Sequence, residues 1–333
     1  MTTVPPVTTE EPLHRISLVI PVYRGADTLP VVVAELAPLA KIQRSPDGHR
    51  FQVTELLLVH DCGPDRSDRC LESMAADYDF VRPIWLSRNF GQHAATLAGM
   101  ASAIGDWVVT LDEDGQQNPA DIARLLDAAV AGALQLVYAS PSNAPPHGWL
   151  RNTASRTAKA LVGTLLGNRT LGQFNSFRLV DGELARTLAA YCGHGIYLDM
   201  GLYWITGRVG HCPVLLRQEL DRPSAYSYLK LLGHFWNLLF TTGTRPLRLI
   251  TLLGFTSVLL AMVIAGYALY SKFFSQMPVQ GWASQIIVVA FFAGCILTAL
   301  GVIAEYLAVT MGIAMGKPLY VVSSKPTRPH ADP

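Results

Sequence analysis

Three consecutive acidic residues, Asp112, Glu113 and Asp114, follow the apolar run from Trp107 to Leu111. Adjacent carboxylates repel one another unless a positive charge lies near them. Alternate side chains of an extended backbone point the same way, so Asp112 and Asp114 can face one ligand. Carboxylate oxygens suit Mg²⁺ or Mn²⁺, and such an ion binds a diphosphate and neutralises its charge. The run therefore predicts a metal and diphosphate site, with a solvated acidic turn before Pro119 as the alternative.

Polar residues also follow two earlier apolar runs of the chain. Tyr23 comes after the first of these runs and Asp61 after the second. In open α/β sheets the ligand lies at the carboxyl ends of the strands. We therefore expect Tyr23 and Asp61 to lie along one edge with Asp112 and Asp114. Asp61 can accept a hydrogen bond from a nucleobase or a ribose there.

Short apolar runs alternate with helix-compatible segments through the first half of the chain. Strands are expected over residues 16–22, 53–60, 81–86, 107–111 and 134–139, and helices over residues 28–39, 92–104 and 119–131. Continuous apolar strands between helices are typical of an α/β fold, in which helices cover both faces of a mostly parallel sheet. Neither GxGxxG nor GxxxxGK[ST] occurs in the sequence. Their absence disfavours a dinucleotide oxidoreductase and a P-loop nucleotidase.

The composition indicates attachment to a membrane. Half of the residues are hydrophobic and 15% are charged, below the usual charged share of about 25%. Two uncharged apolar stretches of 22 residues each occur late in the chain, over 249–270 and 283–304. At 1.5 Å per residue, either one can cross a hydrocarbon layer of about 30 Å. The alternative is a pair of helices buried in a soluble core.

Cations flank these two stretches on the sides that face the chain ends. Arg245 and Arg248 precede the first stretch, the connecting loop carries only Lys272, and three cations follow the second stretch: Lys317, Lys325 and Arg328. This distribution predicts a protein of the cell membrane with two spans and both termini in the cytosol. An acid at the membrane boundary needs a partner, so Glu305 is expected to pair with Arg248 or Arg245.

The predicted organisation has five parts. They are a disordered tail over 1–12, a cytosolic catalytic domain over 13–222, an interfacial amphipathic helix over 223–246, a transmembrane hairpin over 247–310 and a cytosolic tail over 311–333. A second interfacial helix is expected over 149–166, with an ordinary amphipathic helix on the catalytic domain as the alternative. Gly294 and Gly301 permit close helix packing, so homo-oligomerisation through the spans is left open.

Charge and cysteine content exclude other classes of protein. The net charge is +1, which gives no overall field for nucleic acid. The five cysteines are scattered and form no CxxC pair, so neither a disulfide framework nor a zinc site is expected.

Six segments together resemble one enzyme family, the family-2 glycosyltransferases of the GT-A fold that act on polyprenyl phosphates. They occur in the family's order and cover nearly the whole chain: IPVYRGADTL (20–29), LSRNFGQHAATLAGM (86–100), LDEDGQQNP (111–119), AYSYLKLL (225–232), TRPLRLITLLG (244–254) and AEYLAVTMGIAMGKPLYVV (304–322). The resemblance implies a GT-A nucleotide-diphospho-sugar transferase fold. It also implies transfer of a sugar from a UDP-linked donor to a polyprenyl phosphate.

The resemblance further implies roles for individual residues. It implies that the nucleotide sugar is held by Pro21, Tyr23 and Asp61, with a loop beside it formed by Arg88, Asn89, Gly91 and Gln92. It implies that Asp112 and Asp114 are catalytic and bind the metal, and that residues 173–179 line the acceptor side. Arg178 is then the candidate catalytic phosphate ligand, and the remaining acceptor candidates are Arg151, Arg156, Ser176, Arg222 and Ser224.

The sequence departs from the family pattern at four places. It has no Glu near Gly25, and three residues differ from the usual type: His60, Ser176 and Ala225. A weak or inactive membrane-tethered paralogue is therefore one alternative. A processive polysaccharide synthase is another, although such enzymes normally carry a QxxRW segment, which is absent here.

A phosphate acceptor is already nucleophilic at neutral pH. Direct attack of the acceptor phosphate on the anomeric carbon, with inversion, therefore needs little help from a general base.

Overall fold

The computed structural model describes residues 11–143, 174–193, 197–217, 254–257, 259–264, 266–267, 270 and 282–326. The chain divides into two compact units. The first comprises Met1–Thr157, Thr170–Ala225 and Pro318–Pro333, and the second comprises Ala158–Arg169 and Tyr226–Lys317. The interfacial helices expected over 149–166 and 223–246 lie outside the described residues, as do Arg245 and Arg248.

The first unit is built on a nine-stranded mixed sheet with the order β8-β6-β7-β5-β1-β3-β4-β9, and β2 pairs with β3. Its strands are β1 (Leu13–Val22), β2 (Gln43–Arg44), β3 (Arg50–His60), β4 (Val81–Leu86), β5 (Trp107–Thr110), β6 (Leu136–Pro141), β7 (Arg178–Asp181), β8 (Val209–Val214) and β9 (Val322–Ser323). The pairs of β1 with β3 and β5, of β3 with β4 and of β6 with β8 are parallel. All five expected strands are present within a few residues of their predicted bounds.

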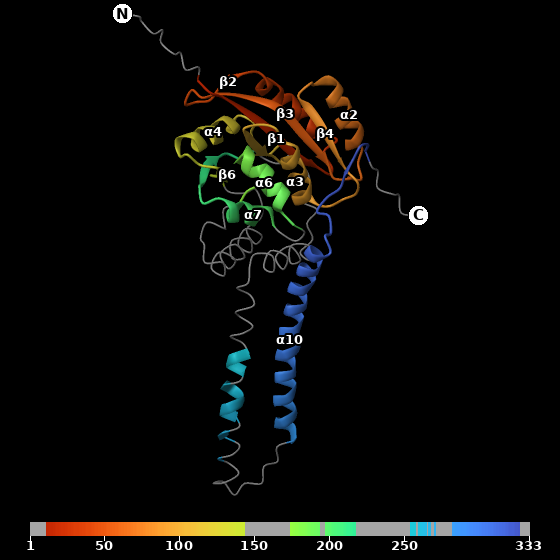
Figure 1. Cartoon of the computed structure of the whole chain (residues 1–333), viewed down its shortest axis with the longest axis vertical. Helices are drawn as coiled ribbons and strands as arrows, with labels where there is room; N and C mark the ends of the chain where they lie inside the picture. Colours follow the sequence, from red (N-terminus) through yellow and green to blue (C-terminus); the bar gives the residue numbers. More distant parts are fainter. Residues whose placement is uncertain are drawn as a thin grey trace, which may run out of the picture. The chain divides into compact units, whose positions relative to one another are not determined.

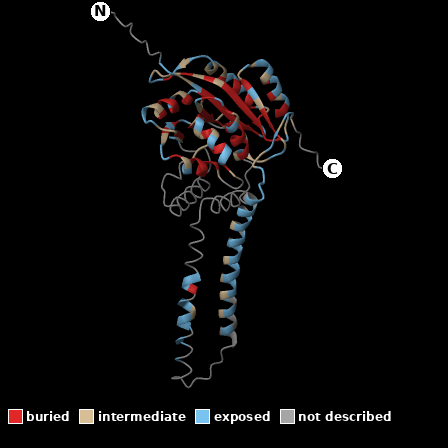
Figure 2. Cartoon of the chain, in the orientation of Figure 1, coloured by how far each residue is buried: buried red, intermediate tan, exposed pale blue. Residues whose placement is uncertain are grey.

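Helices cover both faces of this sheet (Figure 1). One core lies beneath α1 (Leu29–Leu36), α2 (Ser67–Asp77) and α4 (Asp121–Ala131), and the other beneath α3 (Gln92–Ser102), α6 (Gly182–Tyr191) and α7 (Leu198–Ile205). A short 3₁₀ helix, η1 (Ala37–Ala40), continues α1. Alternate residues of β1 serve the two cores: Leu18 and Ile20 face the first and Val19 the second. The predicted α/β architecture is therefore confirmed, and its strands are the most buried part of the unit (Figure 2).

The sequence did not foresee the antiparallel strand β7. It lies between β5 and β6 and runs opposite to both, so the sheet is mixed, although most of its strands run in one direction. β7 begins with Arg178, a charged residue that is buried together with the two residues that follow it. Burial of a charge requires a partner, and no partner is visible in the local sequence pattern. The predicted helix after Pro119 also begins later, at Asp121.

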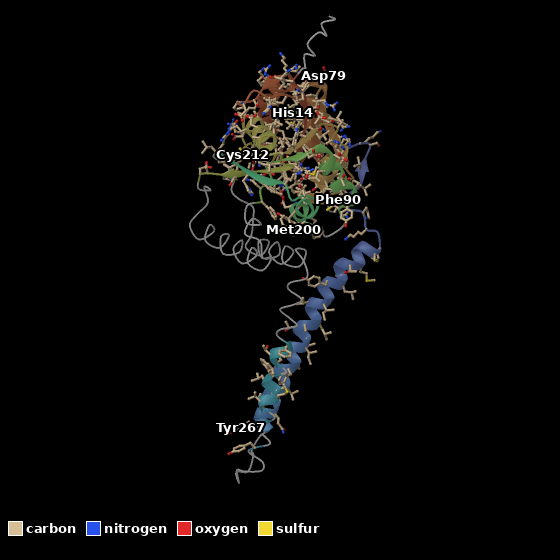
Figure 3. The ribbon with its side chains drawn as sticks, turned by 60° about the vertical axis from the view of Figure 1, so that its left-hand side comes forward. His14, Asp79, Phe90, Met200, Cys212 and Tyr267 are labelled. Atoms are coloured by element: carbon tan, nitrogen blue, oxygen red, sulfur yellow. The ribbon has the colours of Figure 1, made fainter. Side chains whose placement is uncertain are left out.

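The parallel strands give the unit two distinct ends. His14 near the start of β1 and Asp79 just before β4 lie toward one end, whereas Phe90, which follows β4, lies toward the other (Figure 3). The second end is the carboxyl edge of the parallel strands. Every strand-end residue that the sequence singled out belongs to this edge.

The second unit contains α10 (Trp282–Ala314), a helix of 33 residues that includes the second predicted span. Its stretch from Phe291 to Ala308 is long and apolar enough to cross a membrane. The described side chains of α10 are exposed or partly exposed (Figure 2). Within the first predicted span, a shorter apolar helix is described from Gly254 to Ile264. A complete two-helix hairpin is not established by the described residues.

Candidate active site

Asp112 lies directly after β5 and is held by three side chains from three different segments. Gln92 Nε2, at the start of α3, donates to Oδ1 at 2.7 Å. Gln117 Nε2 donates to Oδ2 at 2.9 Å, and its Oε1 accepts from the Asp112 N–H at 2.9 Å. The Ser176 hydroxyl also donates to Oδ2. The carboxylate of Asp112 is therefore fixed in place before any ligand binds.

Burial raises the pKa of Asp112 above its ordinary value, and the hydrogen bond from Ser176 and the charge of Arg178 partly oppose that rise. A carboxylate with a raised pKa is one whose charge is incompletely compensated by its surroundings. A bound cation would supply the missing compensation. Three of about four lone-pair directions of this carboxylate are occupied by donors, and one donor is the exposed side chain of Gln92. Asp112 thus fits a divalent cation.

A chain of buried polar contacts lies beneath Asp112. Thr110 donates its hydroxyl hydrogen to the Ser176 carbonyl, and Arg178 Nε donates to Thr110 Oγ1 at 3.1 Å. The guanidinium of Arg178 pairs with Asp199, which also accepts from the Tyr138 hydroxyl at 2.8 Å. Burial and the charge of Asp199 raise the pKa of Tyr138 well above its ordinary value, so its hydroxyl stays protonated. The ion pair thereby supports β7 and, through Ser176, Asp112.

Asp61 connects two loops at the carboxyl edge. Its Oδ1 accepts from the Phe90 N–H at 2.7 Å and its Oδ2 from the Gly91 N–H at 2.8 Å. Burial raises the pKa of Asp61, and these two hydrogen bonds lower it in part. Gly91 has a φ of +92°, a conformation that favours glycine. Asp61 therefore shapes the loop that leads to Gln92 and so to Asp112.

Glu113 points away from Asp112 toward the loop after β1. Its Oε2 accepts from the Tyr23 N–H at 2.9 Å, and its Oε1 accepts from the Arg24 N–H at 3.0 Å. A Cβ on Gly25 would lie 2.9 Å from Oε2 of Glu113. The space beside Gly25, where the family pattern led us to expect an acid, is therefore occupied by the carboxylate of Glu113.

Asp114 completes the acidic run. Its Oδ1 accepts from the Gln116 N–H at 3.0 Å, which closes a turn at Gly115. Across the described part of the chain, no group of three or more His, Cys, Asp or Glu side chains is placed to hold a metal. Two carboxylates suit Mg²⁺ or Mn²⁺ when a diphosphate and water supply the other oxygens. Asp112 and Asp114 remain the predicted ligands on this basis.

Some of the other predicted site residues lie in the described part of the chain, and the rest lie outside it. Pro21 is buried at the end of β1, and Tyr23 is 39% exposed beside it. Arg88 lies over the ring of Phe90 at 4.2 Å, and Asn89 is exposed in the same loop. Four acceptor candidates lie outside the described residues: Arg151, Arg156, Arg222 and Ser224. Arg178 is buried and paired, so its role as a phosphate ligand stays a prediction.

Sequence reasoning missed three residues that shape the site: Glu113, Gln117 and Asp199. A signal for Glu113 was present, because the middle residue of an extended triplet points opposite to its neighbours. Gln117 carried no such signal, since its contact with Asp112 depends on the turn at Gly115. The signal for Asp199 is weak: it is an acid among apolar residues of the sequence, and the buried ion pair with Arg178 explains its presence.

The comparisons with known proteins place the segment that carries this site in one family. The family model described as "Glycosyl transferase family 2" matches residues 17–199, which contain all of the contacts above. The chain is similar to the undecaprenyl-phosphate 4-deoxy-4-formamido-L-arabinose transferase of Pectobacterium atrosepticum, with 27% identity and 93% of each chain covered. It is also similar to the protein of the same name from Proteus mirabilis, with 29% identity and 95% of each chain covered.

Among solved structures, the chain is similar to glucosyl-3-phosphoglycerate synthase from Mycobacterium tuberculosis. The TM-score is 0.49 at 19% identity, over 70% of this chain and 78% of that one.

Proposed function

Because the chain belongs to glycosyl transferase family 2, we propose that this glycosyltransferase moves a sugar from a nucleoside diphosphate to a polyprenyl phosphate. The donor is UDP-linked, the reaction inverts the anomeric carbon, and it takes place at the cytosolic face of the cell membrane. The acceptor is supported by relatives that match over 93–95% of both chains and are named for undecaprenyl phosphate.

The observation that carries the proposal is the position of Asp112. It lies at the carboxyl end of β5 and is fixed by Gln92, Gln117 and Ser176, which come from three separate segments. Ligands of α/β sheets bind at this edge. A preorganised charge at the site of the leaving group acts without a reorganisation cost at the moment of reaction. We infer that Asp112, with Asp114, binds the diphosphate through Mg²⁺ or Mn²⁺.

The residues of the chain mainly position the reactants. The acceptor phosphate has a second pKa of about 6 and is largely dianionic at neutral pH, so it attacks without a strong general base. The Tyr23 loop and the loop from Arg88 to Gln92 border the donor. When bound, the divalent cation would stabilise the charge that develops on the leaving diphosphate.

Membrane attachment is supported by α10. Apart from Glu305 and a few uncharged polar residues, this helix is apolar on every side, and large side chains are exposed along it, among them Ile296, Leu300 and Leu307. A helix that is apolar on every side is stable only when lipid or protein surrounds it. We propose that it spans the membrane, that the stretch over 249–270 forms the partner span, and that both termini are cytosolic. The domain bounds given above follow from this arrangement.

Incubation of membranes that contain the full chain with undecaprenyl phosphate and a panel of nucleotide sugars tests the proposal. Lipid mass spectrometry should show one Mn²⁺- or Mg²⁺-dependent glycolipid with inverted anomeric configuration. Asp112→Asn should form this product at least about a hundredfold more slowly. Asp106→Asn is the matched control, since Asp106 precedes β5, is exposed and pairs with Arg15 on the neighbouring strand. Product at the wild-type rate from Asp112→Asn, or no product with any donor, would contradict the proposal.

A further inference from the structure

The backbone N–H groups of the loop that carries Tyr23 are bound by side chains from other segments of the chain. Four consecutive backbone N–H groups, from Tyr23 to Ala26, donate to side-chain oxygens. The first two donate to Glu113, Gly25 donates to Ser67 Oγ at 3.1 Å, and Ala26 donates to Asp65 Oδ2 at 3.1 Å. The backbone path of this loop is thus set by residues that follow β3 and β5.

Glu113 holds the end of this loop nearest to the proposed donor. Its carboxylate accepts from Tyr23 and Arg24 together, with Oε2 also 3.2 Å from the Arg24 nitrogen. Hydrogen bonds to an ionised acceptor are about twice as strong as neutral ones. On the other side, a Cβ on Gly63 would lie 1.7 Å from the Tyr23 carbonyl oxygen. The Tyr23 peptide is therefore enclosed between Glu113 and the backbone at Gly63.

We propose that Glu113 is a positioning residue for the nucleotide-sugar donor: it fixes the Tyr23–Arg24 backbone and is not a ligand of the metal. The proposal rests on the proposed function, because Tyr23 is a donor residue only if the chain binds a nucleotide sugar. The three acids of the run then have two different roles. Asp112 and Asp114 serve the diphosphate, and Glu113 presents the partly exposed Tyr23 side chain to the nucleoside.

Two substitutions of Glu113 separate positioning from metal binding. Gln keeps one oxygen, and the Oε2 position lies within hydrogen-bond distance of both N–H groups. Ala keeps none. The donor KM should rise about tenfold or more in Glu113→Ala and about threefold in Glu113→Gln, with kcat nearly unchanged. The Mn²⁺ activation constant should stay at the wild-type value in both variants, whereas Asp114→Asn should raise it.

Binding of UDP in EDTA, measured by calorimetry, gives a readout that is independent of the metal. UDP affinity should fall in the order wild type, Glu113→Gln, Glu113→Ala. Glu72→Gln is the matched control, because Glu72 is an exposed acid on α2. Gly25→Ala tests whether the Glu113 carboxylate lies beside Gly25, because a Cβ at Gly25 would be 2.9 Å from Glu113 Oε2. The effect of Gly25→Ala on the donor KM should be smaller in the Glu113→Ala background, where this clash is removed.

An unchanged donor KM in both Glu113 variants overturns the proposal, as does a raised Mn²⁺ constant with unchanged UDP affinity. If Glu113→Ala does not fold, the donor KM and the Mn²⁺ activation constant of Glu113→Gln test the proposal by themselves. A wild-type protein that neither binds UDP nor transfers sugar refutes the proposed function instead. An active wild type with unaffected variants refutes only the role of Glu113.

Discussion

Arg178 and Asp199 form an ion pair in the interior of the α/β unit, with both side chains 4% exposed. Arg178 belongs to β7 and Asp199 to the first turn of α7, so the pair joins the sheet to a helix that covers it. The Tyr138 hydroxyl and Thr110 complete the hydrogen bonding of the pair.

Removal of one partner should be far more harmful than replacement of both. Asp199→Ala leaves a buried guanidinium without its counterion, and we expect a loss of about 3–5 kcal/mol in the free energy of unfolding. The double variant Arg178→Met with Asp199→Leu should be less destabilised than Asp199→Ala. Urea denaturation of the detergent-solubilised protein measures both. Equal destabilisation of the single and double variants would show that the charges are not coupled.

Asp112→Asn should reduce kcat by about 10²–10³-fold, the range seen when one preorganised electrostatic contact is lost. The pKa of Asp112 is raised in the folded protein, so its ionised form opposes folding above that pKa. In EDTA, the melting temperature of the wild type relative to that of Asp112→Asn should therefore rise as the pH falls and Asp112 becomes protonated. Thermal melts of both proteins at several pH values check this, and a difference that does not change with pH would contradict it.

Ser176→Ala should shift the pH dependence of metal binding. The Ser176 hydrogen bond lowers the pKa of Asp112, so its removal raises that pKa further. Protons then compete with Mn²⁺ at higher pH, and the acid limb of the Mn²⁺ activation profile should move to higher pH. Thr110→Val is a useful comparison, because Thr110 contacts the Ser176 carbonyl and not the carboxylate. If the acid limb of Ser176→Ala stays at the wild-type position, Ser176 does not influence the pKa of Asp112.

Asp61→Asn should loosen the loop from Arg88 to Gln92. The amide retains one acceptor oxygen, so one of the two N–H groups of Phe90 and Gly91 loses its partner. An unsatisfied buried N–H costs about 1–3 kcal/mol. We expect faster hydrogen exchange at these amides and a donor KM raised about tenfold. Protected amides in an enzyme with a raised donor KM would instead indicate direct contact between Asp61 and the nucleotide.

Gly99→Ala should destabilise the fold without touching the site. A Cβ at Gly99 would lie 2.3 Å from Val19 Cγ1 and 3.1 Å from Val59 Cγ2, so α3 packs on the sheet at its closest there. Overpacking of this kind costs about 1–3 kcal/mol. Gly207→Ala is the matched control, since nothing lies within 4 Å of its Cβ position. Similar melting temperatures for the two variants would contradict the close packing of α3.

Local pattern was sufficient to predict the elements that carry a run of apolar residues. β4 has the predicted bounds, 81–86, although it contains Arg82: its last three residues are apolar and buried, and the polar Ser87 follows them. β7 escaped prediction because its stability depends on Asp199 and Thr110, which are distant in sequence from Arg178. Likewise, Asp112 was identified from its place after β5, whereas the contacts that fix it come from Gln92 and Ser176. Long-range polar contacts of this kind leave little trace in a single sequence.

Strand β9 follows α10 in the chain and pairs with β4, and the Ser87 N–H donates to the Val321 carbonyl at 2.9 Å. The edge of the sheet at β4 is thus covered by a strand from the segment that follows α10, far from β4 in the chain. Before β9 docks, β4 presents an unpaired edge, the kind of surface that recruits foreign strands. A stop codon placed after Lys317 would remove β9 and so leave that edge permanently open to aggregation.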